Sequence, residues 1–408
     1  MTKAPRRRHR AATGTLVPAL LTTIAYVDPG NFGTNIVAGT DHGFALVWVV
    51  VLASVSAALI QYLAAKLGLA TGRNLASHYA AGLPRVWRLL AWVQAELVVI
   101  MTDLAEIVGG ALGLYLLFGL PLPLGALLVG LVSFTVLGYQ RGEAAHFQIP
   151  ALALLATVAV CVVTATVRLS PDWNGMLLGV RPAVLDQSAL LVAVGIVGAT
   201  VMPHALYFHS AMSPAVVEES ASGATSPRLA ALVRHRLMSS IALAMTVAGC
   251  VNVLILVLGA ATGTSDGTIE GVYAHLSLDG QRWSAILLGV ALLASGLASS
   301  VIGAWTGQVV MAGFLRRSIP WWVRRLVALA PPVIVLLLGV DAGQALLMSQ
   351  VVLSLALPLT LAPLIVITSR RTVMGALANG RVLTVLAGAV ALAIIALDLA
   401  LLLPGATR

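Results

Sequence analysis

Long apolar stretches separated by short polar segments run through almost the whole chain. A helix needs about 20 apolar residues to cross a bilayer, and eleven stretches have that character. They lie at about 15–39, 44–69, 89–118, 121–139, 146–167, 187–212, 237–261, 283–312, 322–340, 343–368 and 382–403. The pattern therefore predicts an all-α, polytopic membrane protein with eleven transmembrane helices.

Two of the apolar stretches contain helix breakers near their middle. The first break is Asp28-Pro29-Gly30-Asn31 in span 1, and the second is Met202-Pro203-His204 in span 6. Proline lacks the backbone donor that a helix needs, and glycine tolerates non-helical conformations. Backbone carbonyls freed inside a bilayer are tolerated only where protein encloses them, and paired broken helices are typical of transporter substrate sites. The sequence therefore predicts a transport site where the two breaks meet.

The two breaks lie five spans apart, and an odd offset inverts the topology of the second half. We therefore expect spans 1–5 (about 15–167) and spans 6–10 (about 187–368) to form a 5+5 inverted repeat, with span 11 (about 382–403) as an addition. No composition shift divides residues 15–408, which are interpreted as a single transmembrane domain behind a basic tail, residues 1–14. The repeat is inferred from span counting and the paired breaks, because direct similarity between the halves is weak.

Composition excludes an ordinary soluble domain, because only 10% of the 408 residues are charged and 59% are hydrophobic, whereas soluble domains carry roughly a quarter charged residues. The net charge of +9 comes from basic residues that are concentrated in the loops on one side of the membrane. Twenty basic residues occupy alternate loops and flanks: Lys3, Arg6, Arg7, Arg8, Arg10, Lys66, Arg73, Arg85, Arg88, Arg141, Arg228, Arg234, Arg236, Arg316, Arg317, Arg324, Arg325, Arg370, Arg371 and Arg381. Four fall on the other side: Arg168, Arg181, Arg282 and Arg408. This asymmetry predicts a cytoplasmic N-terminus and an outer C-terminus. The tail is expected to contact anionic lipid head groups rather than nucleic acid.

The residue types in the two breaks favour a transition-metal cargo. Asp28 and Asn31 are three residues apart, so a partly helical backbone turns both oxygen-bearing side chains toward one point. Met202 adds a thioether, a soft ligand that Mg²⁺ and Ca²⁺ do not use, and oxygen with sulfur points to Mn²⁺, Fe²⁺ and later first-row ions. Taken alone, Met202 also fits a core gap-filler. Asp28 is more informative, since an ionisable group at membrane depth is costly and usually functional.

Span 3 carries three acids, Glu96, Asp103 and Glu106, whose spacings of seven and three place them on one helical face. Three ionised acids on one membrane helix would repel one another, so we expect at least one to take up a proton near neutral pH. Arg324 and Arg325, at the start of span 9, are candidate partners, and cytoplasmic anchoring is the alternative for this pair.

His204 directly follows the proline of the break in span 6. Because the intrinsic pKa of histidine lies near neutrality, this residue is a candidate proton gate or a group that tunes Asp28. The alternative is a histidine bonded to a freed backbone carbonyl. His209, further along the same helix, is interpreted either as a packing residue or as part of a polar path. Lys66, near the cytoplasmic end of span 2, is expected to snorkel to the interface.

Several separated motifs, in order, resemble the Nramp family of proton-coupled divalent metal transporters along nearly the whole chain. They are DPGN at 28–31, AELVVIMTDLAEIVGG at 95–110, GLPLPLG at 119–125, MPHALYFHS at 202–210, WWVRRL at 321–326 and SQVVLSLALPL at 349–359. The resemblance implies a LeuT-type fold, in agreement with the inverted repeat. Ala205 departs from the asparagine that many relatives carry after the MPH triplet. We expect it to tune rate or conformational balance without altering the class of ion.

The resemblance also implies roles for individual residues. Asp28, Asn31 and Met202 would be metal ligands, the carbonyls of Ala25 and Ala199 would approach the ion in some states, and Gln350 would join when the site is occluded. Asp28 would also be the first proton acceptor and would pass the proton, directly or through His204, toward Asp103, Glu106 and Arg325. Relatives that move Mg²⁺ alter the ligand motifs, which are intact here. The metal is substrate, and no resident cofactor is expected.

The sequence thus predicts secondary active import of Mn²⁺ or Fe²⁺ across the plasma membrane, coupled to protons, by alternating access. A Mg²⁺ transporter and a sodium-coupled amino-acid symporter of the same fold are the alternatives, although Met202 has no obvious use in the latter. Paired broken helices favour a carrier over a channel. An enzyme is disfavoured, because the ligand set lacks a histidine-rich or HExxH arrangement. The choice between Mn²⁺ and Fe²⁺, the proton stoichiometry and the oligomeric state stay open, and a monomer is compatible with the sequence.

Overall fold

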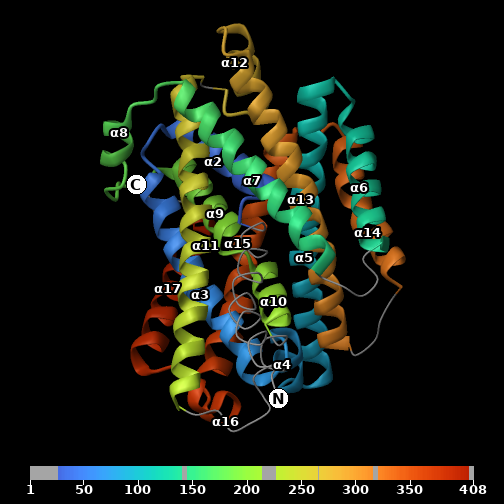
Figure 1. Cartoon of the computed structure of the whole chain (residues 1–408), viewed down its shortest axis with the longest axis vertical. Coiled ribbons are helices and arrows are strands. Elements are labelled where there is room, and N and C mark those ends of the chain that lie inside the picture. The colour runs from blue at the N-terminus through green and yellow to red at the C-terminus, as the bar shows by residue number, and fades with distance from the viewer. Residues whose placement is uncertain (1–25, 140–144, 214–226, 265, 316–319, 404–408) are drawn as a thin grey trace, which may run out of the picture.

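The computed structural model describes residues 26–139, 145–213, 227–264, 266–315 and 320–403. In these segments the regular structure is helical and no strand occurs (Figure 1). The elements are α2 (Pro29–His42), α3 (Val47–Thr71), α4 (Leu75–Ala81), α5 (Arg85–Phe118), α6 (Leu122–Tyr139), α7 (Ala145–Arg168), α8 (Trp173–Leu178), α9 (Gln187–Val201), α10 (Pro203–Met212), α11 (Pro227–Thr262), α12 (Ile269–Leu278), α13 (Arg282–Leu315), α14 (Trp321–Leu337), α15 (Ala342–Ser369), α16 (Arg371–Met374), the 3₁₀ turn η2 (Gly375–Leu377) and α17 (Arg381–Leu402).

The predicted spans coincide with these helices. Span 1 corresponds in its second half to α2, and its first half lies outside the described residues, as does the basic tail. Span 6 corresponds to α9 and α10 together, and every later span matches one helix. By length and composition, seven of the described helical stretches suffice to cross a membrane, and shorter apolar helices occur at Leu122–Thr135 and Leu152–Arg168.

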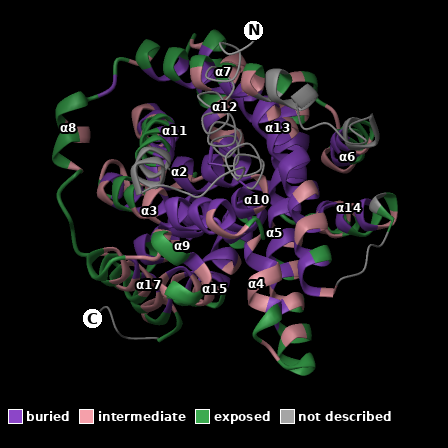
Figure 2. Cartoon of the chain, turned by 60° about the horizontal axis from the view of Figure 1, so that its bottom comes forward, coloured by how far each residue is buried: buried purple, intermediate pink, exposed green. Residues whose placement is uncertain are grey.

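Small residues let the central helices approach closely. A Cβ added at Gly39 of α2 would lie 2.1 Å from the Leu256 carbonyl oxygen of α11, and one at Gly296 of α13 would lie 2.7 Å from Gly110 of α5. Membrane helices associate through such close contacts, since lipid offers no hydrophobic drive between them. Figure 2 shows the result: burial concentrates on α2, α5, α9, α10 and α13, while α17 and α8 lie at the periphery with many exposed residues.

Both predicted breaks are present. Tyr26, Val27 and Asp28 are non-helical, and α2 begins at Pro29, with the Asp28 carboxylate accepting a hydrogen bond from the Asn31 amide (2.9 Å). This is an N-cap with proline in the first turn, which a helix N-terminus favours. The second break is one residue long: α9 ends at Val201, α10 begins at Pro203, and Met202 between them has φ of 30°. A side-chain-bearing residue rarely adopts positive φ, and such strain concentrates at functional sites.

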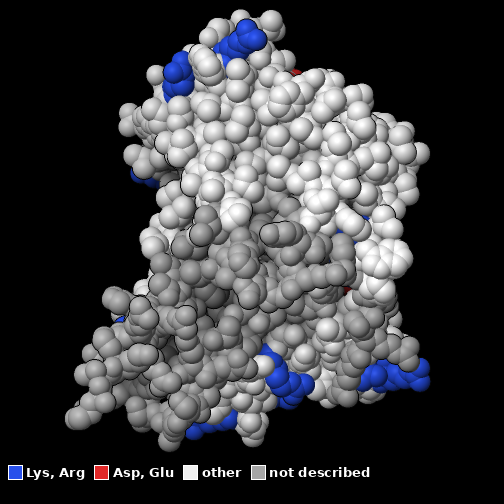
Figure 3. All heavy atoms as spheres, turned by 45° about the vertical axis from the view of Figure 1, so that its right-hand side comes forward, with Lys and Arg blue, Asp and Glu red and all other residues white. Residues whose placement is uncertain are grey.

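The two ends of the bundle differ in the basic residues they carry. Figure 1 places α4 and α16 at one end and α8 and α12 at the other. Arg73, Arg85, Arg370, Arg371 and Arg381 flank the helix ends beside α4 and α16. On the face shown in Figure 3, most of the visible basic side chains lie near the two ends, and the described surface between them is mostly uncharged. An uncharged band of this kind suits contact with lipid tails.

Candidate metal site and its proton-accepting surroundings

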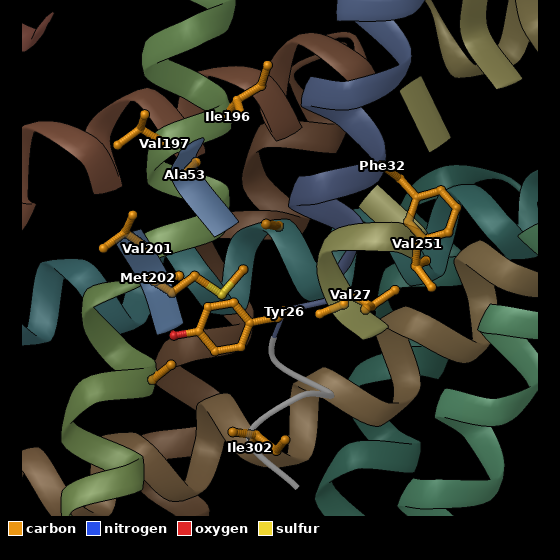
Figure 4. Packing of buried hydrophobic residues seen from close by; sticks show 14 of the residues in the cluster. Tyr26, Val27, Phe32, Ala53, Ile196, Val197, Val201, Met202, Val251 and Ile302 are labelled. Carbon is orange, nitrogen blue, oxygen red and sulfur yellow. The ribbon is translucent and has the colours of Figure 1, made fainter. Parts of the chain in front are cut away.

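The two breaks meet through the side chain of Asn31. Its Nδ2 donates to the Asp28 carboxylate (2.8 Å) and to the carbonyl oxygens of Ala199 (3.0 Å) and Tyr26 (3.3 Å). Asp28, Asn31 and Met202 are all buried, and Figure 4 shows the Met202 thioether extending from the α9–α10 junction toward the segment of Tyr26 and Val27. The structure therefore brings the three predicted side-chain ligands to the region where the broken helices face each other.

The freed carbonyls of the first break are held by side chains from distant helices. Asn252 of α11 donates to the Tyr26 oxygen (3.1 Å), and Ser295 of α13 donates to the Val27 oxygen (2.6 Å). A buried carbonyl left without a donor costs free energy, so these side chains stabilise the open turn. The carbonyl of Ala199, in the second break, accepts from Asn31. Ala25 lies outside the described residues.

Gln350 lies against the first break. A Cβ added at Gly30 would come within 2.3 Å of the Gln350 Nε2, so the carboxamide occupies the space that the glycine leaves. The Nε2 donates to the Ser349 hydroxyl (3.0 Å), whereas the buried Oε1 receives no hydrogen bond from the described residues. A side chain that completes the coordination of an ion would need such an oxygen, unpaired and beside the break.

His204 is joined to α5 through Thr102. The His204 Nδ1 is 3.0 Å from the Thr102 hydroxyl, which donates its one proton to the Val98 carbonyl (3.0 Å). The other ring nitrogen, Nε2, is buried without a partner in the described part of the chain. The ring thus bonds to a side chain of α5, and the alternative of a bond to a freed backbone carbonyl is wrong for Nδ1.

The acids of α5 and the arginines of α14 form two ion pairs. Arg325 contacts the Asp103 carboxylate (2.9 Å) and the Ser133 hydroxyl (2.5 Å), and Arg324 contacts Glu96 (2.8 Å). Arg324 also donates to the Ala304 carbonyl (3.2 Å) and is buried, which disfavours simple anchoring at the interface. The arginines thereby supply the counter-charges that two of the three acids need at this depth.

Glu106 is the acid of this group that no arginine contacts within the described segments. It is buried, and neither carboxyl oxygen has a hydrogen-bond partner there. A Cβ on Gly303 would lie 2.5 Å from a Glu106 oxygen and 3.1 Å from an Asp103 oxygen, so both carboxyls face the same turn of α13. An unpaired carboxylate in such a place needs a proton or a cation, and Glu106 is thus suited to accepting a proton.

Sequence reasoning missed a second polar chain, which joins the first break to α10. Gln61 of α3 donates to the Tyr26 hydroxyl, and its Oε1 lies 2.8 Å from the His209 Nδ1. Of the two interpretations of His209, this placement favours the polar path. Gln61 had a visible signal, since it is the lone amide of an apolar span. Thr102 and Ser133 had none, because such hydroxyls commonly bond within their own helix.

The expectation that Lys66 snorkels to the interface is wrong. The side chain is buried, its ammonium donates to the Asn379 carboxamide, and it lies 5.1 Å from the Tyr62 ring centroid. The segment after α15, which contains α16, η2 and Asn379, packs against α3. It thereby covers the lysine, an arrangement that depends on a contact far away in sequence.

Comparisons with known proteins agree with this architecture. Residues 19–404 match the family model Nramp, described as natural resistance-associated macrophage protein-like. The divalent metal cation transporter MntH of Yersinia pestis (strain Pestoides F) is 42% identical over 397 residues, 95% of this chain and 94% of that protein. MntH of Bacillus subtilis (strain 168) is 38% identical over 395 residues, 95% of this chain and 91% of that protein.

Solved structures extend the comparison to the fold. A crystal structure of an Eremococcus coleocola manganese transporter, in complex with an aromatic bis-isothiourea substituted compound, superposes with a TM-score of 0.85 at 29% identity, covering 98% of this chain and 88% of that one. Mhp1, a nucleobase-cation-symport-1 family transporter, superposes with a TM-score of 0.64 at 17% identity, covering 95% and 88%. The second likeness concerns the fold alone.

Proposed function

The chain belongs to the Nramp family and transports divalent metal ions, and we propose that it imports Mn²⁺ or Fe²⁺ into the cytoplasm together with protons. It is a multi-pass membrane transporter of LeuT-type fold with spans 1 and 6 broken, and not an enzyme. The relatives are named divalent metal cation transporters, and one structural relative is named a manganese transporter.

The ligand chemistry at the two breaks carries the proposal. Asp28 supplies a carboxylate, Asn31 an amide oxygen, Ala199 a carbonyl and Met202 a thioether. The Asn31 Oδ1 is contacted at the limit of hydrogen bonding, by Thr200 at 3.5 Å, which leaves it able to ligate. Gln350 closes over the ion with its Oε1, and the carbonyl of Ala25 completes the set in some states. Sulfur beside oxygen selects Mn²⁺ and Fe²⁺ over Mg²⁺ and Ca²⁺.

Protons leave the same site by way of α5. Asp28 releases a proton when the cation binds, because the metal takes the place of the proton on the carboxylate. The start of α2 packs on α5 so closely that a Cβ on Gly109 would meet Pro29 at 2.0 Å, one turn from Glu106. His204 reaches α5 through Thr102, the neighbour of Asp103. The proton therefore moves from Asp28, directly or through His204, to Glu106 and Asp103, and on toward Arg325, Glu96 and Arg324.

Transport proceeds by alternating access, in which the broken helices of spans 1 and 6 rock against spans 3, 4, 8 and 9. The two halves, about 15–167 and 187–368, act as the inverted repeats, with the span at 382–403 outside them and residues 15–408 forming one domain. The basic end of the bundle faces the cytoplasm, which puts the N-terminus inside and the C-terminus outside. The tail 1–14 contacts anionic lipid, and one copy of the chain contains the whole site.

The test is Mn²⁺ uptake into proteoliposomes at two external pH values, with competing Ca²⁺ or Mg²⁺, for the wild type and Met202→Ala. We expect saturable uptake that is faster at acid pH, with Ca²⁺ inhibiting only the variant, because the thioether has been removed. Mg²⁺ or Ca²⁺ uptake by the wild type at the rate of Mn²⁺ would refute the ligand assignment and favour a Mg²⁺ transporter. Wild-type uptake independent of pH and of membrane potential would refute proton coupling.

A further inference from the structure

An acid on the peripheral helix α17 has no part in the site described above. The buried residues of α17 are Ala387, Ile394 and Asp398, which share one face at spacings of seven and four. Asp398 is 5% exposed, one of its carboxyl oxygens accepts from the Ser354 hydroxyl of α15 (2.8 Å), and the other is buried without a partner among the described residues. An acid kept at membrane depth is costly and is a functional candidate by default.

Ser354 lies one helical turn beyond Gln350. At this turn α9 packs tightly on α15: a Cβ added at Gly198 would lie 1.9 Å from the Gln350 carbonyl oxygen and 2.9 Å from the Ser354 nitrogen. Gly198 directly precedes Ala199, whose carbonyl is bonded to Asn31. Asp398 is therefore connected to the metal site through two helix contacts, although it does not line that site.

The Ser354 hydroxyl donates to another helix, which is unusual for a serine within a helix. Serine and threonine hydroxyls within helices commonly donate to the carbonyl three or four residues earlier, as Ser349 and Thr368 do in α15 (both 2.7 Å). Ser354 donates out of its helix instead, to α17. Pro358, four residues on, has no N–H for the Ser354 carbonyl, so the helix is also weakened at this turn.

We propose that Asp398 is a positioning residue for Gln350. By accepting the hydrogen bond from Ser354, it fixes the turn of α15 that carries Gln350. The Gln350 carboxamide lies against Gly30, so Asp398 sets how well Gln350 closes over the transported ion. The inference rests on the proposed function in one respect, the role of Gln350 as a ligand. The hydrogen bonds that hold Asp28 and Asn31 involve neither Ser354 nor Asp398.

Transport kinetics of four variants test the proposal. Asp398→Ala and Ser354→Ala each remove the hydrogen bond, and we expect the KM for Mn²⁺ to rise about fivefold, with the maximal rate changed less than twofold. Asp398→Asn keeps an accepting oxygen and should stay within twofold of the wild type. Thr384→Ala is the matched control, because it removes another α15–α17 hydrogen bond, to Ser369 (3.2 Å), without touching this turn.

Whether the effect of Asp398→Ala depends on Gln350 distinguishes a positioning role from general damage to the fold. In a Gln350→Ala background, Asp398→Ala should raise the KM no further. A further fivefold rise there, or a loss in Asp398→Asn equal to that in Asp398→Ala, would overturn the proposal.

A measurement without transport keeps the inference separate from the proposed function. In detergent without metal, amide hydrogen exchange across 346–357 should be faster in Asp398→Ala than in the wild type and unchanged in Thr384→Ala. Equal exchange in Asp398→Ala and the wild type overturns the positioning role. If exchange responds as expected but the wild type transports no Mn²⁺, the proposed function fails while the link between Asp398 and α15 stands.

Discussion

Removing Arg325 should destabilise the folded protein far more than removing its neighbour Arg324. Arg325→Met takes the counter-charge from the Asp103 carboxylate, which is fully buried, and also leaves the Ser133 hydroxyl without its donor. Stranding one member of a buried ion pair costs about 3–5 kcal/mol. Glu106, which also has no hydrogen-bond partner in the described segments, faces the same turn of α13, so the loss would leave two acids together without a cation.

Arg324→Met is the matched comparison. Its partner Glu96 has a side chain 22% exposed, whereas that of Asp103 is fully buried, so the stranded carboxylate is less enclosed and the cost should be smaller than for Arg325→Met. The assay is thermal unfolding of the purified protein in detergent, followed by the fraction that remains monodisperse. The double variant Asp103→Asn, Arg325→Met should recover most of the loss, because no unpaired charge is left at Asp103. Equal losses for the two single arginine variants, or no recovery in the double variant, would refute the reasoning.

Two further predictions concern packing and pH. Gly39→Val should destabilise the folded protein by about 3 kcal/mol, at the upper end of the cost of overpacking, because its Cβ would meet the Leu256 carbonyl oxygen at 2.1 Å. Gly388→Val is the control, since its Cβ meets nothing within 4 Å among the described residues. It should have no such effect in the same unfolding assay. In α12, outside the spans, burial raises the pKa of the Glu270 carboxyl, and the charges of Asp341 and Asp266 raise it further. An acid whose folded pKa is raised favours folding below its unfolded pKa and loses that contribution as pH rises. Glu270→Gln should therefore raise the melting temperature at pH 7.5 but not at pH 4, and the same shift at both values would contradict this account.

The sequence was sufficient for the spans and the breaks because both are local properties. Hydropathy alone located the long apolar helices, but not the short helices α4, α8, α12 and α16 that lie between the predicted spans. The helix breakers located the turns at Asp28 and Met202. The acids of α5 were found from their spacing, and the partners Arg324 and Arg325 from their motif. Lys66 was misjudged because its environment is made by Asn379, more than three hundred residues away. Gln61 and Asp398 were identifiable as polar residues in apolar spans, but their partners depend on how the helices pack.

The capping of the first break shows why the site depends on the assembled bundle. Tyr26, Val27 and Asn31 belong to the first predicted half, whereas the groups they bond, on Asn252, Ser295 and Ala199, belong to the second. A carbonyl left unpaired in lipid costs several kcal/mol, so the open turn at Asp28 is stable only when α9, α11 and α13 are packed against it. These three bonds therefore cross the boundary between the two halves. Any motion that moves one half against the other must therefore exchange these bonds for others, with water or with the cargo ion, at the moment when the site opens.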